Sequence, residues 1–185
     1  MILLPEKKYA VIYADPPWDF RTHSDKGKGR SACQHYTIPD FQALLDLPVA
    51  DIAADNATLL MWVTDPHLCQ GLQLMEAWGF SYKTVGFYWA KENRKSPGFF
   101  TGMGYWTRAN PEMCLLGTKG APRRKAKDVK KLIVSKLREH SRKPDEVRER
   151  IERLLDGPYL EMFARSTAPG WDSWGNQAGV FDTKE

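Results

Sequence analysis

The chain has 185 residues, a length that suits one α/β domain and is too short for two ordinary domains joined by a linker. Hydrophobic residues make up 42% of it and aromatic residues 12%, which excludes an intrinsically disordered chain because this is enough apolar surface to form a core. The formal net charge of +4 is by itself weak evidence for a polyanionic partner. We predict a single domain over residues 1–185.

Two further classes are excluded by the apolar and cysteine patterns. No run of the sequence approaches the ~20 apolar residues of a membrane span, and the N-terminus lacks the charge order of a secretion signal, so we expect a cytoplasmic protein with no membrane partner. Cys33, Cys69 and Cys114 are odd in number, far apart and without matching histidine spacing. We expect neither disulfides nor a metal site.

The first predicted element is a strand over Tyr9–Ala14, a continuous apolar and β-branched run typical of a strand buried on both faces. It ends at Asp15-Pro16-Pro17, because two prolines remove two backbone donors and hold φ near about −65°. Residues 19–36 are polar and lack periodicity, which predicts a loop. A short helix over 39–45 and a second buried strand over 57–63 follow.

The middle of the chain alternates between helix and strand patterns. Thr64-Asp65-Pro66 predicts a capped helix start with proline in the first turn, and Gly79 predicts the end of that helix. Strands are predicted at 81–89 and 111–116, with a glycine-rich loop over 94–105 between them.

The last third repeats the alternation with a short strand at 132–134, an amphipathic helix over 143–155 and a strand at 159–164. Strands that alternate with helices predict an α/β fold with a mainly parallel, Rossmann-like sheet flanked by helices. Such sheets bind ligands at the carboxyl ends of their strands, where Asp15 and Arg165 are expected.

Basic residues crowd together over 119–150, as in Arg123-Arg124-Lys125-Ala126-Lys127 and Lys130-Lys131. A run of this kind is more often a solvated face, and it is otherwise a surface that contacts the phosphates of a nucleic acid. The sequence leaves both interpretations open.

The turn Asp15-Pro16-Pro17-Trp18 combines groups that suit methylation of an amine. A lone Asp-Pro-Pro is typical of a simple strand-ending turn. The amino group of adenine is a poor nucleophile because its lone pair is delocalised into the ring, and the Asp15 carboxylate and the Pro16 carbonyl can each accept one of its N–H groups as it attacks a sulfonium methyl. The prolines supply rigidity, and Trp18 offers a flat face on which an extruded base can stack.

Further motifs follow this turn along the chain. They are Leu60-Met61-Trp62-Val63-Thr64, Ala77-Trp78-Gly79-Phe80, Gly104-Tyr105-Trp106, Glu112-Met113-Cys114-Leu115-Leu116-Gly117, Glu139-His140-Ser141-Arg142-Lys143-Pro144-Asp145-Glu146, Glu161-Met162-Phe163-Ala164-Arg165, Gly170-Trp171 and Trp174-Gly175-Asn176-Gln177. With Ala14-Asp15-Pro16-Pro17-Trp18 and in this order, they make the chain resemble the MT-A70 family of adenine methyltransferases over nearly its whole length.

The resemblance implies a Rossmann-like methyltransferase fold that is circularly permuted, with the catalytic loop before the cofactor strand, and S-adenosylmethionine as the cofactor. It implies that residues 15–18 are catalytic. It also implies a set of cofactor-binding residues: Asp15, Lys143, Glu161, Arg165, Asn176 and Gln177. From the residues alone, a solvated lysine at a helix start is the preferred interpretation of Lys143. A salt-bridged pair is the alternative for Glu161 and Arg165, and a simple turn is an equal alternative for Asn176-Gln177. Thr167-Ala168 stand where the family's messenger-RNA enzymes carry a His-Asn pair.

The loop after Trp18 is expected to fold over the target base. Its predicted substrate-binding residues are Lys26, Lys28, Arg30, His35 and Tyr36. Lys91, Arg94 and Lys95 are predicted to contact phosphate.

The compact chain resembles the family's bacterial and phage members, so DNA is favoured over RNA as the nucleic-acid partner. Two alternatives stay open: the same reaction on RNA adenosine, or an inactive nucleic-acid-binding partner subunit. We expect a monomer or a homodimer, and a partner subunit is left open.

Overall fold

The structure, a computed structural model, describes residues 3–18, 40–104, 106–138 and 142–182. Its centre is a seven-stranded sheet in the order β5-β3-β4-β2-β1-β6-β7. The strands are β1 (Tyr9–Ala14), β2 (Ala53–Val63), β3 (Ser81–Glu92), β4 (Glu112–Lys119), β5 (Leu132–Lys136), β6 (Tyr159–Met162) and β7 (Trp171–Trp174). The helices are α1 (Phe41–Leu45), α2 (Val49–Ile52), α3 (Leu68–Ala77), α4 (Glu146–Leu154) and the 3-10 helix η3 (Asp65–His67). The predicted α/β class is confirmed.

The sheet is mainly parallel, as predicted. Strand β4 is antiparallel to both of its neighbours, β2 and β3, whereas the other pairs run parallel. Strand β1 lies between β2 and β6, and its last residue, Ala14, pairs with Met61 on one side and Met162 on the other. The carboxyl end of β1 is therefore held in the middle of the sheet. The predicted circular permutation stays a prediction.

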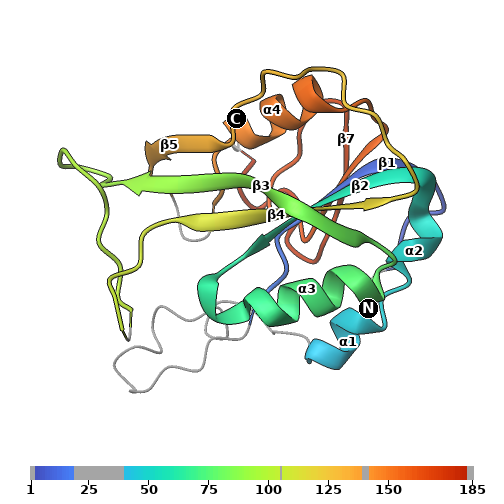
Figure 1. Cartoon of the computed structure of the whole chain (residues 1–185), viewed down its shortest axis with the longest axis horizontal. Coiled ribbons are helices and arrows are strands. Elements are labelled where there is room, and N and C mark those ends of the chain that lie inside the picture. Colours follow the sequence, from blue (N-terminus) through green and yellow to red (C-terminus); the bar gives the residue numbers. More distant parts are fainter. Residues whose placement is uncertain (1–2, 19–39, 105, 139–141, 183–185) are drawn as a thin grey trace.

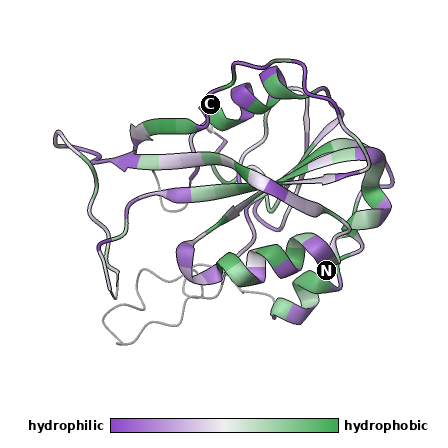
Figure 2. Cartoon of the chain, viewed as in Figure 1, coloured by the Kyte–Doolittle hydropathy of each residue, from purple (hydrophilic) through white to green (hydrophobic). Residues whose placement is uncertain are grey.

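Helices cover both faces of the curled sheet. Helices α1 and α3 pack on one face and α4 on the other (Figure 1). Because strand side chains alternate between faces, Ile12 joins a core cluster with Trp78, whereas Tyr13 joins a second cluster with Trp62 and Ile151. Figure 2 shows the helices as amphipathic, with hydrophobic and hydrophilic residues alternating along α3 and α4.

Two details differ from the sequence prediction. The helix expected from Thr64 onward is divided into η3 and α3, and the Thr64 hydroxyl bonds Nδ1 of His67 at 2.8 Å rather than capping a backbone amide. The sequence analysis also missed β7, whose four residues are too few to show a clear alternation. Trp171 and Trp174 are its buried side chains, and its backbone pairs with β6.

The predicted glycine-rich loop is a projecting arm, which we define as residues 93–111; Tyr105 lies outside the described residues. The arm extends from β3 beyond the body of the protein and returns to β4 (Figure 1). Asn110 holds its base, since its side-chain amide donates to the Lys91 carbonyl at 2.8 Å and accepts from the Lys91 amide at 2.9 Å. Further out, the Gly102 amide donates to the Ala109 carbonyl at 2.7 Å. A Cβ on Gly104 would lie 1.9 Å from the Thr107 carbonyl oxygen, so this close approach requires glycine.

Gly79 ends α3 in the left-handed conformation, at φ +82°. We expect Gly79→Ala to lower the stability by about 1 kcal/mol, because an L-residue is strained at positive φ, and thus to lower the Tm by about 2–4 °C. The added Cβ would meet Ala50 at 3.4 Å, an ordinary contact, so the backbone alone carries the cost. Thermal denaturation checks this, with Gln73→Ala on the exposed face of α3 as the control. An unchanged Tm for Gly79→Ala would contradict it.

Candidate active site

The Asp15-Pro16-Pro17-Trp18 turn is fixed on both sides. The Asp15 amide continues the pairing of β1 with β6 by donating to the Met162 carbonyl at 3.5 Å. On the other side the Trp18 indole N–H donates to the Trp62 carbonyl of β2 at 2.9 Å. Pro16 is buried. The turn therefore presents Asp15 from a rigid support at the carboxyl end of β1.

Trp18 is an anchor of this turn. Its side chain is only 6% exposed, and its ring stacks on the imidazole of His67 with a centroid distance of 5.6 Å. The predicted stacking of an extruded base on Trp18 stays a prediction. A base that used this indole would meet a side chain already packed on one face.

The Asp15 carboxylate begins a chain of alternating charges. It accepts a hydrogen bond from the Lys143 ammonium at 2.7 Å, and that ammonium lies 3.4 Å from Glu112. Glu112 in turn pairs with Lys91 at 2.5 Å. The Lys91 side chain is 14% exposed and its charge is engaged by Glu112, and the prediction that it contacts phosphate stays a prediction. We call the group formed by Asp15, Lys143, Glu112 and Lys91 the ion-pair network.

Burial and neighbouring charges have opposite effects on the pKa values of the ion-pair network. Burial raises the pKa of the Asp15 carboxyl above its ordinary value, although Lys143 opposes the rise. Burial would raise the pKa of Glu112 as well, but two ammonium groups outweigh it and lower that pKa. For Lys143, burial favours the neutral form, yet the charges of Asp15 and Glu112 prevail and raise the pKa. Lys143 is therefore a cation at neutral pH.

A second cluster surrounds Glu161 at the end of β6. Its carboxylate accepts a hydrogen bond from Arg148 of α4 at 2.7 Å, and the same guanidinium donates to the Ser166 hydroxyl at 2.6 Å. Burial raises the pKa of Glu161, and Arg148 partly offsets the rise. The sequence analysis did not single out Arg148, because its pairing depends on how α4 packs on the sheet.

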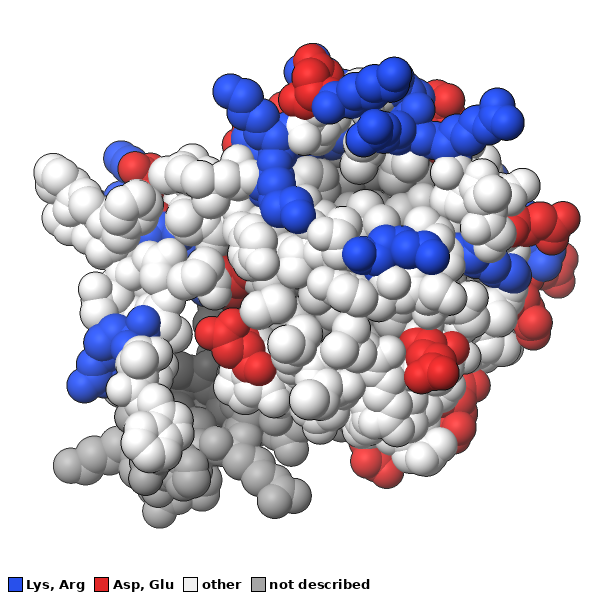
Figure 3. Space-filling model, viewed as in Figure 1, with Lys and Arg blue, Asp and Glu red and all other residues white. Residues whose placement is uncertain are grey.

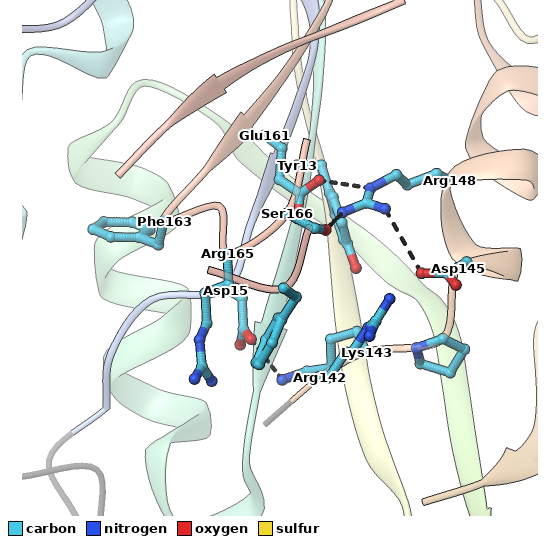
Figure 4. Close-up of a pocket in the computed structure, with 12 residues that line it drawn as sticks. Tyr13, Asp15, Arg142, Lys143, Asp145, Arg148, Glu161, Phe163, Arg165 and Ser166 are labelled. Atoms are coloured by element: carbon cyan, nitrogen blue, oxygen red, sulfur yellow. Dashed lines mark hydrogen bonds and ion pairs between the residues drawn. The ribbon is translucent and has the colours of Figure 1, made fainter. Parts of the chain in front are cut away.

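A pocket lies between the Asp15–Lys143 pair and this second cluster, as Figure 4 shows. Its lining includes Asp15, Lys143, Glu161 and Arg165, which the sequence predicted. The other lining residues are Tyr13, Arg142, Pro144, Asp145, Arg148, Phe163, Ser166 and Phe181.

Phe181 gives the pocket an aromatic wall. The centre of its ring lies 4.2 Å from the Arg165 guanidinium and 5.4 Å from that of Arg142, so both arginines make cation–π contacts with it. Its amide donates to the Arg165 carbonyl at 2.8 Å, which fixes the returning chain next to the pocket. Nothing in the sequence pattern singled out this residue.

The remaining predicted site residues lie elsewhere or outside the description. Asn176 and Gln177 follow β7 in a turn, where the Gln177 carbonyl accepts from the Val180 amide at 3.1 Å, and they do not line the pocket. Their cofactor roles stay predictions. The predicted substrate-binding residues Lys26, Lys28, Arg30, His35 and Tyr36 lie outside the described residues.

Several cations of the basic run at 119–150 make contacts within the protein. Lys119 donates to the Ala50 carbonyl at 2.9 Å, and Lys125 pairs with Asp156 at 3.2 Å. The Arg150 guanidinium pairs with Glu146 at 2.6 Å. Figure 3 shows Lys and Arg gathered along the upper rim, with acidic groups among them. These contacts favour the solvated-face interpretation.

Other classes of site were tested in the described part of the chain. No helix there is long and apolar enough to cross a membrane. Within the same residues, no cluster of His, Cys, Asp and Glu has the make-up of a metal site.

Comparison with known proteins identifies this arrangement. The MT-A70 family model matches residues 9–177, a span that contains the whole sheet and the ion-pair network. The chain belongs to the MT-A70 methyltransferase family. This family has a Rossmann-like methyltransferase fold and takes its methyl group from S-adenosylmethionine.

Relatives in this family differ greatly in length. The chain is 35% identical to the Type II methyltransferase M.MunI of Mycoplasma sp, over 93% of the chain and 78% of that protein. It is 33% identical to the human N(6)-adenosine-methyltransferase catalytic subunit METTL3, over 92% of the chain but 28% of that protein. A putative N(6)-adenosine-methyltransferase MT-A70-like protein of Medicago truncatula is 37% identical, over 92% of the chain and 26% of its own length.

The groups that line the pocket suit S-adenosylmethionine. The cofactor carries a carboxylate, an amino group, ribose hydroxyls and an adenine ring. Lys143 and Arg165 offer cations for the carboxylate, and Asp15 and Glu161 offer acceptors for the amino and hydroxyl groups. Phe181 adds an aromatic surface.

The charges of the ion-pair network should determine how activity depends on pH. Because Glu112 contributes to the raised pKa of Asp15, we expect Glu112→Gln to lower that pKa and to move the acidic limb of the kcat/KM profile to lower pH. Initial rates of methyl transfer over a pH series measure the limb, since kcat/KM reports ionisations of the free enzyme. Glu149→Gln, an exposed position on α4, is the control and should leave the limb in place. A shift to higher pH would contradict the assignment.

Proposed function

We propose that this protein transfers the methyl group of S-adenosylmethionine to the exocyclic N6 amine of adenine in DNA. The observation that carries the proposal is the position of Asp15: a carboxylate at the rigid tip of β1, bonded to Lys143 and facing the pocket. In an MT-A70 methyltransferase, this is the position where a carboxylate meets both the amine and the methyl donor.

The proposed chemistry follows from the acceptor groups of the turn. The Asp15 carboxylate and the Pro16 carbonyl each accept one N–H of the target amine and so direct its lone pair at the methyl carbon. When bound, S-adenosylmethionine supplies a methyl group on a positively charged sulfur. The new N–C bond forms as the C–S bond breaks, and the amine then loses one proton to water. No prior deprotonation is required, so the raised pKa of Asp15 matters only because the carboxylate must be ionised to accept well.

Lys143 is the proposed link between the turn and the cofactor. Its ammonium donates to Asp15 at 2.7 Å, lies 3.4 Å from Glu112 and lines the pocket, so it contacts the turn and faces the proposed cofactor position. We assign the cofactor carboxylate to Lys143 and Arg165, and the ribose hydroxyls to Glu161, which Arg148 orients. Asn176 and Gln177 are proposed to reach the cofactor from the turn after β7.

DNA is the proposed polymer for one main reason. The chain spans 78% of M.MunI, named a Type II methyltransferase, and only 28% of METTL3, named an N(6)-adenosine-methyltransferase. Bacterial and phage family members of the kind that the sequence resembles act on DNA. We further propose that residues 1–185 act as one methyltransferase domain in the cytoplasm, and that Lys26, Lys28, Arg30, His35 and Tyr36 contact the substrate.

Parallel assays on DNA and RNA oligonucleotides of the same sequence test the proposed polymer. We expect kcat/KM for transfer of labelled methyl to be higher on DNA. A preference for RNA would overturn the choice of polymer, and no transfer to either would favour an inactive partner subunit. Calorimetric titration with S-adenosylmethionine separates these cases, since an inactive subunit without a cofactor site shows no uptake.

A further inference from the structure

The arm, residues 93–111, has an unusual composition for a surface segment. It contains the cations Arg94, Lys95 and Arg108, and it contains no aspartate or glutamate. It also carries four aromatic residues: Phe99, Phe100, Tyr105 and Trp106. Cations interleaved with aromatic rings, without acidic groups, are the chemistry by which proteins hold a nucleic-acid strand, because the rings stack on bases and the cations contact phosphates.

Three large apolar side chains among the described residues of the arm are exposed. Trp106 is 91% exposed, Met103 68% and Phe99 62%. Arg94, Lys95 and Arg108 are exposed too. Figure 3 shows the arm, at the left of the view, as mostly uncharged surface with Lys or Arg groups. A tryptophan side chain this exposed contributes little to the hydrophobic core.

The arm is attached to the catalytic end of the sheet. Asn110 joins its base to Lys91, and the Phe100 amide donates to the Lys91 carbonyl at 2.8 Å. Lys91 pairs with Glu112, which pairs with Lys143 beside Asp15. A strand that contacts the arm is thereby positioned relative to the Asp15 turn.

We propose that the arm binds the nucleic-acid strand next to the target base, with Trp106 stacking on an unpaired base and Arg94, Lys95 and Arg108 contacting phosphates. The proposal rests on the proposed function insofar as this strand is the substrate. Charge favours this occupant over a second copy of the chain, because the cationic, acid-free arm would face a protein of net charge +4.

Binding of a short fluorescein-labelled single-stranded oligodeoxynucleotide, followed by anisotropy over a series of salt concentrations, tests the proposal. Trp106→Ala should weaken binding by about 5- to 100-fold, with little change in the salt dependence. The triple variant Arg94→Ala, Lys95→Ala, Arg108→Ala should reduce the slope of log K against log salt by about 2, or ~0.7 for each phosphate contact.

Matched controls separate local from general effects. Arg123→Ala, Arg124→Ala, Lys127→Ala removes the same charge from another exposed segment, and Tyr82→Ala removes an exposed aromatic ring from β3. Both should bind the oligonucleotide as the unchanged protein does. Calorimetric binding of S-adenosylmethionine should be the same for every variant, which shows that the pocket is intact.

Each outcome decides the matter. Unchanged affinity in Trp106→Ala and in the arm triple variant overturns the proposal, as does a loss equal to that of the controls. If Trp106→Ala lowers the molecular mass of the protein in solution and leaves oligonucleotide binding unchanged, the arm contacts a second copy of the chain and the proposal is overturned. Arm-dependent binding without methyl transfer supports the arm proposal and refutes the proposed function, so the two fail separately.

Discussion

Asp15→Asn protein is expected to lose methyl transfer by about 10²- to 10³-fold or more while its fold is retained. The amide keeps the shape of the side chain but loses the negative charge that stabilises the developing positive charge on the amine. It also presents an NH₂ group where an acceptor is required. Lys143 keeps Glu112 as a partner, at 3.4 Å, so no charge is left isolated. Initial-rate assays at saturating S-adenosylmethionine measure the loss.

A matched control exists just before the amino end of β6, away from the carboxyl end of β1. Asp156 also pairs with a lysine, Lys125, at 3.2 Å, but its side chain is 81% exposed and far from the pocket. Asp156→Asn should transfer methyl groups at the unchanged rate. Near-normal activity in Asp15→Asn, or an equal loss in both variants, would refute the role of Asp15.

Lys143→Met protein is expected to be less stable by about 3–5 kcal/mol at neutral pH, because removal of a buried cation leaves two carboxylates close together without it. Lys143 is 11% exposed, Asp15 25% and Glu112 19%, so water screens these charges poorly. The Tm should fall by about 6–20 °C. Thermal denaturation measures the fall.

The loss of stability in Lys143→Met should depend on pH in a definite direction. Loss of the cation raises the folded-state pKa of Asp15 further above its unfolded value, so this carboxyl destabilises the fold increasingly as pH rises through that pKa. The Tm difference from the unchanged protein should therefore shrink at acidic pH. Lys125→Met removes an exposed pair and should cost less than about 1 kcal/mol at either pH. A Tm difference that does not change with pH would contradict the buried ion-pair network.

Local sequence signals were sufficient for most of the fold. The apolar run of β1, the proline pair after Asp15 and the Val147 and Ile151 spacing of α4 each predicted their element, because strands and helices bury one period of side chains. Gly79 predicted the end of α3 for an equally local reason, its positive φ. The family motifs gave Asp15, Lys143, Glu161 and Arg165, which the structure brings to one pocket.

The missed features depend on contacts between distant segments. Lys91 pairs with Glu112 because the end of β3 lies beside the start of β4, and the sequence did not predict this pair. Arg148 reaches Glu161 only once α4 packs on the sheet, and Phe181 reaches Arg165 only after the chain returns past β7. No periodicity or turn signal encodes such pairings.

The central claim is that the Asp15 turn directs adenine N6 at a donated methyl group. Nucleoside mass spectrometry after incubation of the protein with isotopically labelled S-adenosylmethionine and adenine-containing DNA tests it most directly. The account predicts the label in N6-methyladenine, and its loss with Asp15→Asn. Label in a cytosine or on another adenine atom, or N6-methyladenine formed undiminished by Asp15→Asn, would contradict it.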